Sequence, residues 1–279
     1  MSNLATILPV KSNAIIKNDL SEVTLKITNF SFIVKLIMRQ LIFLFFFIVS
    51  HFYSSSQQLA SSRGYSVQSA SGIDSAIYKM VGPYRENVDK TMNEVLAENE
   101  ADLLKEIPDS RLGNFLADAY LWAARQKMDK DAEIAFMNHG GVRINRIGKG
   151  TVTRRTIYEV MPFDNLLVVA EVSGVLLQQY LDKIAADGGG GGVAGIRFAI
   201  SEKKAVDVMV NGKPLDLNRT YKMVNSDYTL DSGSGIPAFK TLKQVRSGYL
   251  MRDAIIQYCQ YLQQSGKKIS VEPQMRISK

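Results

Sequence analysis

Histidine and cysteine, from which many catalytic centres are built, are scarce in this sequence of 279 residues. It has two histidines, His51 and His139, and one cysteine, Cys259. A dinuclear metal site needs several His and carboxylate ligands that converge, and a Ser/His or Cys/His dyad needs a histidine beside the nucleophile. Because His51 falls in the targeting segment predicted below, one histidine remains, which cannot supply the first and gives little support to the second. We therefore expect no catalytic residue, no metal ligand and no cofactor in this chain.

A disulfide framework and a basic patch are excluded as well. A single cysteine forms no intrachain disulfide, and Cys259 lies on the apolar face of a predicted helix, where a thiol is typical of a small buried side chain. No run of five or more Lys and Arg residues occurs. The first 56 residues hold five positive and two negative side chains, which leaves +4 of the net charge of +7 for the rest. A nucleic-acid partner is therefore not supported.

Long hydrophobic runs are missing too. The apolar run from Leu41 to Val49 is too short to cross a bilayer, which takes about 20 residues. It follows Arg39 and precedes three serines, the three-part pattern of a secretory signal peptide, which we place at residues 38–56. We interpret residues 1–37 as an over-extended start and expect export to the periplasm or cell envelope. The alternative is an uncleaved segment that anchors the protein to the membrane.

The remainder has the composition of a globular protein, with 46% apolar and 22% charged residues in the whole chain. After a Ser-, Gln- and Gly-rich linker at 57–72, helices and strands mix without strict βαβ alternation. This predicts one α+β domain over residues 73–279, with a mixed β-sheet flanked by helices. Helices are expected at 73–88 (broken or bent near Gly82 and Pro83), 112–128, 153–160, 174–187 and 249–262, and Thr153 and Ser173 are expected to cap the third and the fourth of them. Strands are expected at 134–137, 149–152, 165–172, 196–200, 206–210, 221–224 and 269–271, and residues 94–104 fit an edge strand or a loop.

The stretch AFMNHGGVR, residues 135–143, ends a predicted buried strand in polar residues and two glycines. Bare backbone N–H groups then lie beside the Asn138 amide, with Arg143 just behind, which suits an anionic or hydroxyl-rich ligand. An ordinary strand-to-loop turn is the alternative. The glycines from Gly188 to Gly192 predict a mobile loop, and residues 225–237 predict a loop too polar for the core.

Two of the strand-end loops, 162–165 and 225–235, each offer an aromatic residue in polar surroundings, Phe163 and Tyr228. Rings of this kind stack on a flat base, each for about 1–3 kcal/mol. Alternatively, each ring covers the core. Asp227 and Asp231 are either acceptors for ribose hydroxyls or solvated charges. The sequence contains no GxxxxGK[ST] phosphate loop.

Four motifs in order, LGNFLADA (112–119), NHGGVR (138–143), MPFDN (161–165) and NSDYTLDSGSG (225–235), resemble the C-terminal domain of the 5′-nucleotidase family. The likeness covers roughly residues 73–279. This family joins an N-terminal metallophosphatase domain, which holds the metal ions and the catalytic Asp–His pair, to a C-terminal domain that grips the nucleoside. The Asp-x-His and Gly-Asn-His-Glu motifs of the first domain have no match in this sequence.

The resemblance implies roles for individual residues. Asn138 is similar to the family's base- or ribose-contacting Asn, and Arg143 to the arginine on the ribose and phosphate side. Phe163 resembles the first stacking aromatic. Tyr228 stands where the family usually has a second Phe, and a phenol ring still stacks.

Two departures from the family pattern affect the expected site. His139 replaces the first glycine of a triplet that continues with Gly140 and Gly141, so a bulky ring is expected in the phosphate-side loop. Ser234 replaces the Asp that bonds the ribose hydroxyls, and Asp231 is the nearby acid that can compensate. The loss of a charged hydrogen bond costs about 1.5–3 kcal/mol.

We therefore expect the nucleoside- or nucleotide-binding half of a 5′-nucleotidase-like phosphoesterase of nucleotide catabolism. By resemblance it belongs to a hydrolase, and the divalent metals come from a separately encoded metallophosphatase chain. Whether the chain itself is an enzyme stays open. The alternative is a non-catalytic exported protein that binds nucleosides or another sugar-containing ligand. A decayed relative with a structural role is a third interpretation, favoured by Ser234.

Overall fold

The computed structural model describes residues 35–45, 47 and 75–279. The chain divides into two compact units, residues 1–71 and 72–279. In the first unit, residues 35–45 and 47 are helical and exposed. Most of the predicted over-extended start and signal peptide, and the whole of the predicted linker, lie outside the described residues. Among the described helices, none has the length and apolar content that a membrane span requires.

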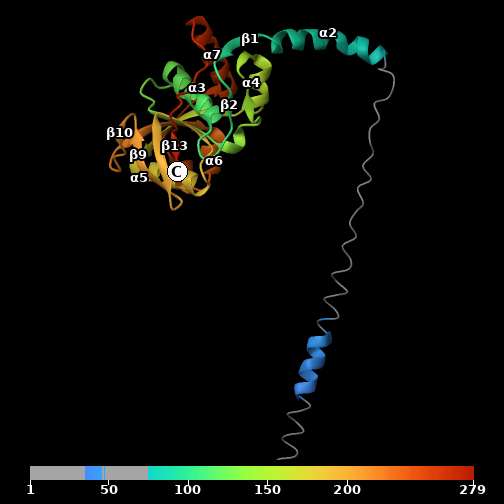
Figure 1. The fold of residues 1–279 in the computed structure, drawn as a ribbon, viewed down its shortest axis with the longest axis vertical. Helices are drawn as coiled ribbons and strands as arrows, with labels where there is room; N and C mark the ends of the chain where they lie inside the picture. The colour runs from blue at the N-terminus through green and yellow to red at the C-terminus, as the bar shows by residue number, and fades with distance from the viewer. Residues whose placement is uncertain (1–34, 46, 48–74) are drawn as a thin grey trace, which may run out of the picture. The chain divides into compact units, whose positions relative to one another are not determined.

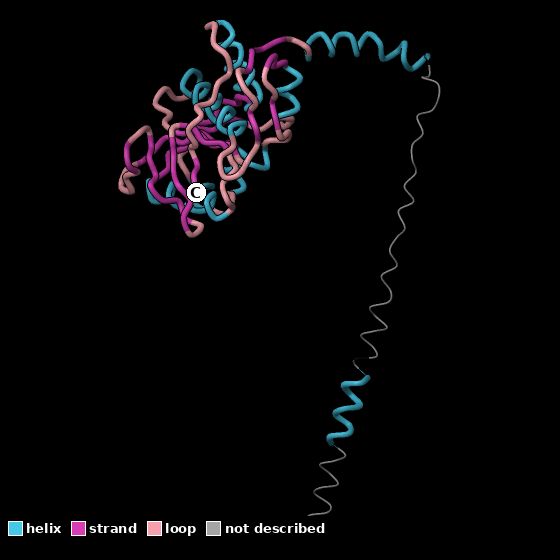
Figure 2. Tube along the Cα trace, in the orientation of Figure 1, coloured by secondary structure: helices cyan, strands magenta, loops and turns pink. Residues whose placement is uncertain are grey.

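A five-stranded mixed sheet forms the centre of the second unit (Figures 1 and 2). Its strands are, in order across the sheet, β12 (Gln244–Leu250), β6 (Leu166–Ser173), β11 (Thr220–Ser226), β3 (Ile134–Met137) and β7 (Gly192–Ala194). Neighbours pair antiparallel except β3 and β11, which run parallel. The mixed sheet and the α+β class predicted from the sequence are thus confirmed.

Both faces of this sheet are buried over β3, β6, β7 and β11, because residues of each of these strands enter two different apolar clusters. In β3, Ala135 and Met137 join the cluster under α3 (Arg111–Lys127), α4 (Arg154–Val160) and α7 (Met251–Gln264). Ile134 and Phe136 join the cluster on the other face, with α5 (Gly174–Ala186) and strands of a second sheet. This explains why the short run from 134 to 137 is apolar throughout rather than alternating.

The second sheet has four strands, β10 (Lys213–Pro214), β9 (Lys204–Val210), β8 (Ile196–Ser201) and β13 (Ile277–Ser278), and β13 pairs parallel with β8. Two antiparallel pairs complete the described strands: β1 (Val95–Asn99) with β5 (Gly150–Thr153), and β2 (Leu103–Leu104) with β4 (Arg146–Ile147). Residues 94–104 therefore contain both predicted options, two strands and the loop between them.

Side-chain hydroxyls cap the N-termini of four helices, α3, α4, α5 and α6 (Asp227–Ser232). The predicted cap Thr153 accepts a hydrogen bond from the backbone of Thr156 in a capping box, and the predicted cap Ser173 accepts one from Leu176. Ser110 caps α3 in the same way, and Ser226 caps α6. Each cap satisfies an N–H group that a helix start leaves unpaired. The chain direction at these helix starts is thereby fixed.

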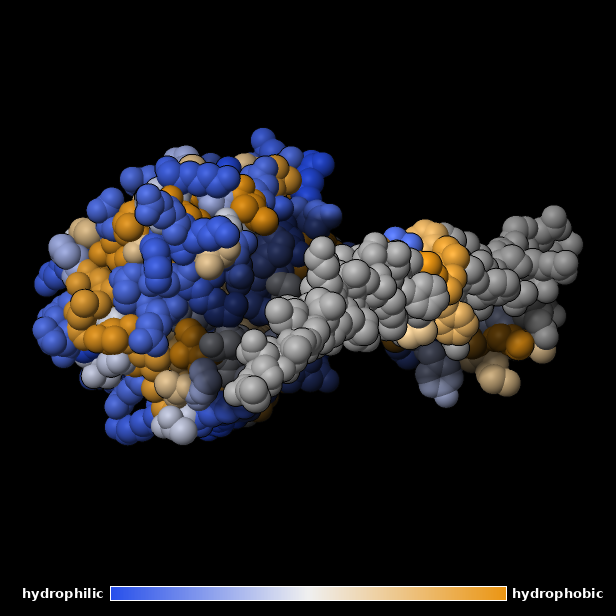
Figure 3. All heavy atoms as spheres, turned by 90° about the horizontal axis from the view of Figure 1, so that it is seen from below, coloured by the Kyte–Doolittle hydropathy of each residue, from blue (hydrophilic) through white to orange (hydrophobic). Residues whose placement is uncertain are grey.

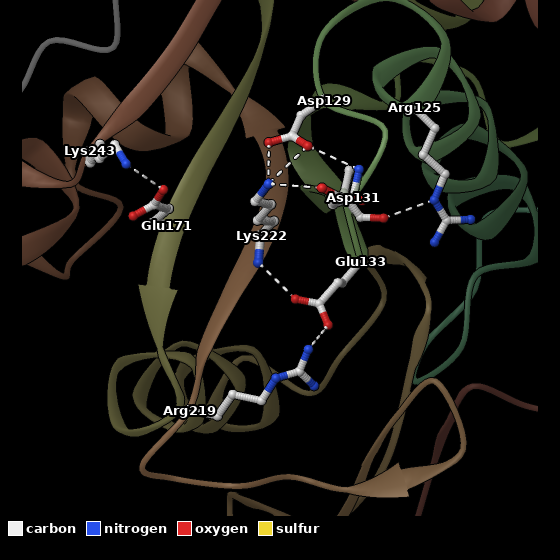
Figure 4. A network of polar contacts seen from close by, with 9 residues as sticks. Arg125, Asp129, Asp131, Glu133, Glu171, Arg219, Lys222 and Lys243 are labelled. Atoms are coloured by element: carbon white, nitrogen blue, oxygen red, sulfur yellow. Dashed lines mark hydrogen bonds and ion pairs between the residues drawn. The ribbon is translucent and has the colours of Figure 1, made fainter.

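A group of charged residues, here called the Lys222 cluster, joins the amino ends of the two parallel strands (Figure 4). The Lys222 ammonium lies 2.8 Å from Asp129 and 3.6 Å from Asp131. The Glu133 carboxylate accepts a hydrogen bond from the Lys222 backbone at 3.2 Å and pairs with Arg219. The cluster therefore sets the register of β3 against β11 from one end of the sheet.

Hydrophilic residues cover most of the domain surface on the face drawn in Figure 3.

Four elements differ from what the sequence predicted. The first helix of the domain, α2 (Ser75–Met92), is not broken at Pro83. Residues 225–237, expected to be a polar loop, contain the end of β11, the helix α6 and the buried residues Thr229 and Leu230. Strand β12 was not predicted. At the expected strand 269–271, Ile269 makes only an isolated bridge to Asn99, and the last strand is β13.

The glycines from Gly188 to Gly192 are tightly packed, which corrects the expectation of a mobile loop. The Gly190 N–H donates to Pro108 at 2.6 Å, and Gly192 belongs to β7, opposite Met137. A Cβ atom on Gly192 would lie 1.8 Å from the carbonyl oxygen of Gly113 in α3. Glycine is needed here because two backbones approach closely, not because the chain must move.

We predict that Gly192→Ala destabilises the domain by about 1–3 kcal/mol, because α3 or β7 must move to admit the methyl group. The melting temperature is then expected to fall by several degrees. Gly82→Ala in α2 is the matched control, since a Cβ there meets no atom within 4 Å. Thermal unfolding followed by circular dichroism compares the two variants. Equal melting temperatures would contradict the close approach of α3 and β7.

Candidate functional site

The edge of the five-stranded sheet that lies opposite the Lys222 cluster brings separate chain segments together. The parallel strands β3 and β11 both end there, so residues 138–143 and 226–228 are neighbours. Strand β6 runs antiparallel to β11 and begins at this edge, where Leu167 pairs with Ser226. Strand β12 ends there as well, and the Met251 N–H donates to the Asn165 carbonyl at 2.9 Å. Residues 138–143, residues 162–165 and the starts of α6 and α7 therefore lie at the same edge of the sheet.

These segments enclose a cavity of about 590 Å³. Six of the seven site residues expected from the sequence line it: Asn138, Gly140, Gly141, Arg143, Phe163 and Tyr228. The other lining residues are Met137, Met161, Asp164, Asn165, Ser226 and Met251. The structure thus gathers most of the expected residues in one place, while their role as ligand contacts stays a prediction.

The two aromatic side chains of the cavity are exposed instead of covering the core. Phe163 is 38% exposed and Tyr228 is 62% exposed. The Arg143 guanidinium carbon lies 5.2 Å from the centre of the Phe163 ring, and its Nη1 donates to the Gly140 carbonyl at 3.2 Å. A cation over a ring face is attracted by the ring's quadrupole. Arg143 is therefore held beside the ring that the sequence proposes for stacking.

Asp227 links the loop of Phe163 to the helix that carries Tyr228. Its Oδ1 accepts hydrogen bonds from the Asn165 side-chain amide at 3.0 Å and from the Tyr228 N–H at 2.7 Å. The sequence offered Asp227 as a ribose acceptor or a solvated charge, and gave no hint of this link. Because one carboxylate oxygen binds both segments, the backbone that carries Phe163 is tied to the backbone that carries Tyr228.

Arg252, the second residue of α7, supports the Phe163 loop. Its side chain is 10% exposed. Nη1 donates to the Phe163 carbonyl at 3.3 Å, and Nη2 donates to Oδ1 of Asp164 at 2.6 Å. The guanidinium carbon also lies 4.4 Å from the centre of the Tyr158 ring. The planar fork of an arginine is suited to holding a backbone carbonyl and a carboxylate at once.

Buried polar and aromatic contacts support the Tyr228 segment. The Asn225 side chain donates to the Tyr180 hydroxyl at 3.3 Å and accepts from the Ser226 N–H at 2.8 Å. The Tyr180 ring lies edge-on to Phe136 and to Phe239, each at 5.0 Å between ring centres. Burial raises the pKa of Tyr180, so its hydroxyl stays neutral and available to Asn225. The segment before Tyr228 is therefore anchored in the core.

Asp231 and His139 lie differently from what the sequence suggested. Asp231 is not among the residues that line the cavity, and both of its carboxylate oxygens contact Arg246, one of them at 3.1 Å. Hydrogen bonding to this guanidinium lowers the pKa of Asp231, so the carboxylate is ionised and already paired. The His139 ring lies 2.7 Å from the Gly190 carbonyl and, with Ser234, lines a separate cavity of about 190 Å³. The His139 ring is not among the residues that line the main cavity.

Sequence reasoning missed several lining and supporting residues. Asp164 and Asn165 belong to the quoted MPFDN run, and their polar side chains beside Phe163 were the signal that went unused. Met251 and Arg252 had no such signal, because only the end of β12 brings them to this edge. Within the part of the chain that the structure describes, no three His, Cys, Asp or Glu side chains are grouped to hold a metal ion.

Known proteins that resemble this chain include 5′-nucleotidases. Over 173 residues it is 28% identical to a 5′-nucleotidase of Vibrio vulnificus, covering 59% of this chain and 30% of the relative. It is 32% identical over 145 residues to protein UshA of Yersinia enterocolitica, covering 50% and 26%. The structure of a 5′-nucleotidase precursor from Thermus thermophilus superposes with a TM-score of 0.61 and 28% identity, covering 74% of this chain and 43% of that one. The chain spans less than a third of the length of these two curated relatives.

Most of the segments that form the sheet and the cavity also match the sequence model of a protein family. The sequence model of the family described as 5′-nucleotidase, C-terminal domain, covers residues 90–241, which is more than half of the chain. The match includes all the segments that line the cavity except Met251. The protein therefore belongs to the 5′-nucleotidase C-terminal domain family.

Proposed function

We propose that this protein is the nucleoside- or nucleotide-binding half of a 5′-nucleotidase-like phosphoesterase in nucleotide catabolism. The observation that carries the proposal is that Phe163 on a loop and Tyr228 on helix α6 are both exposed and line one cavity with Asn138 and Arg143. Two rings offer stacking surfaces to a flat base. The amide and the guanidinium offer hydrogen bonds and a positive charge to the ribose and phosphate.

The size and fixed shape of the cavity agree with this proposal. Its volume of about 590 Å³ lies within the range of small-molecule sites, roughly 300–1,000 Å³. Asp227 and Arg252 hold the aromatic loops before any ligand arrives. Little conformational entropy then remains to be lost on binding, which favours affinity.

The second part of the proposal is that a separate metallophosphatase chain supplies the metal ions and the activated water. It is supported by the scarcity of histidine in the sequence and by the lack of a metal-binding group among the described residues. In this division of labour, the chain orients the nucleoside and its partner cleaves the phosphate ester. We also propose that the protein acts outside the cytoplasm, on the basis of the signal-peptide pattern at 38–56.

We predict that adenosine and AMP bind the protein and that the double variant Phe163→Ala with Tyr228→Ala loses at least about tenfold in affinity, since two stacking faces are removed. Isothermal titration calorimetry measures both proteins. Val245→Ala is the control, because Val245 is a 44% exposed apolar residue that does not line the cavity. Identical heats for the double variant and the parent would remove the base-stacking assignment.

We also predict that the purified chain releases no phosphate from AMP, with or without added Mg²⁺, Mn²⁺, Co²⁺ or Zn²⁺. The reason is that the described part of the chain contains no group of side chains that could hold a metal ion to activate water. A phosphate-release assay checks this, with a complete 5′-nucleotidase as the positive control. Metal-dependent turnover by the chain alone would refute the division of labour. If the chain binds nucleosides and no enzyme co-purifies with it, the alternative of a non-catalytic binding protein is favoured.

A further inference from the structure

Asp164 places a carboxylate in the cavity that the proposed function does not use. Among the described residues that line the cavity, it is the one acidic side chain. Its side chain is 79% exposed, although its partner Arg252 is 10% exposed. Asp164 directly follows Phe163 in the sequence, and both residues line the cavity. This position differs from that of Asp231, which lies outside the lining and is occupied by Arg246.

Arg252 fixes the direction of this carboxylate. One guanidinium donates both to the Phe163 carbonyl at 3.3 Å and to Oδ1 of Asp164 at 2.6 Å. The Tyr158 ring stacks on that guanidinium at 4.4 Å and keeps it in place. The Phe163 backbone and the Asp164 carboxylate are thus held by the same planar group. Oδ2 of Asp164 has no contact within the described structure that would compete with a ligand for it.

An ionised carboxylate accepts hydrogen bonds and cannot donate them. It therefore attracts an amino group on the edge of a base and repels a carbonyl oxygen in the same position. The phosphate side of a nucleotide is excluded as its target, because two like charges at short distance repel each other. Two parts of a nucleoside offer donors to it, the ribose hydroxyls and an amino group on the base. Because Asp164 follows Phe163, the residue proposed to stack on the base, and both line the cavity, we take the edge of the base as its target.

We propose that Asp164, oriented by Arg252, is a specificity-determining residue that selects bases with an amino group over bases with a carbonyl oxygen at the same position. This inference rests on the proposed nucleoside binding. Asp164 acts by direct contact with the base, whereas Arg252 is a positioning residue that acts through Asp164 and the Phe163 backbone.

Adenosine and inosine form the ligand pair, because ring position 6 carries an amino group in adenosine and a carbonyl oxygen in inosine. Inosine also carries a proton on the adjacent N1, so the two ligands differ at both positions. By calorimetry, the parent protein is expected to bind adenosine at least about tenfold more tightly than inosine. In Asp164→Ala that ratio is expected to fall to about one. Asp164→Asn, which keeps the shape but adds a donor, is expected to lower the ratio as well.

The ratio is the informative quantity, because a loosened loop would weaken both ligands alike. Asp164→Ala removes the carboxylate that pairs with the buried Arg252. The double variant Asp164→Ala with Arg252→Met removes the carboxylate and the arginine charge together, so no buried charge is left without its partner. Asp89→Ala is the matched control, since Asp89 also pairs with an arginine, Arg155 at 2.8 Å, and does not line the cavity. It should keep the parental ratio.

The outcomes separate this inference from the proposed function. If both nucleosides bind the parent equally, or if Asp164→Ala and Asp164→Asn keep the preference for adenosine, the role of Asp164 is refuted while nucleoside binding stands. If neither nucleoside binds the parent, the proposed function fails and the inference fails with it. A ratio that falls in the Asp164 variants and persists in Asp89→Ala supports the selection of amino-bearing bases.

Discussion

The site depends on the parallel pairing of β3 with β11 inside a sheet whose other described pairs are antiparallel. Parallel strands end at the same edge, so Asn138 and Tyr228, which are 90 positions apart in the sequence, come to lie around one cavity. The antiparallel neighbour β6 then begins at that edge and adds Phe163. With β3 antiparallel to β11 instead, Asn138 would lie at the opposite end of β11, away from Tyr228.

Rigidity comes from burial on both faces of the sheet and from a few long-range polar contacts. Two apolar clusters hold the strands, and Gly192 lets β7 approach α3 at backbone distance. The loops themselves are held by Asp227 and Arg252, each of which binds two chain segments or two groups of one segment. The shape of the cavity therefore depends on contacts that also engage some of its lining side chains, among them Asp164 and Asn165.

Local sequence patterns predicted much of this structure. The apolar run at 134–137, the caps Thr153 and Ser173, and the α+β class agree with the structure because each depends on residues close in the chain. The four ordered motifs predicted the family, and six of the seven expected site residues line one cavity.

What the sequence did not predict depends on distant partners. Strand β12 is exposed over much of its length and forms because β6 offers an edge with which it can pair. The segment after Asn225 reads as a polar loop, yet Ser226 and Thr229 are buried because they bond to each other at a helix start. Arg252 has no local signal, since its contacts are with residues almost 90 positions earlier.

The guanidinium that rests on the Phe163 ring also affects how separate molecules of the protein meet in solution. Exposed aromatic side chains at the mouth of a cavity favour unwanted association between molecules. Arg143 covers part of one such ring with a well-hydrated, positively charged group. The charge on Arg143 therefore interrupts the apolar surface at the mouth of the cavity without closing it.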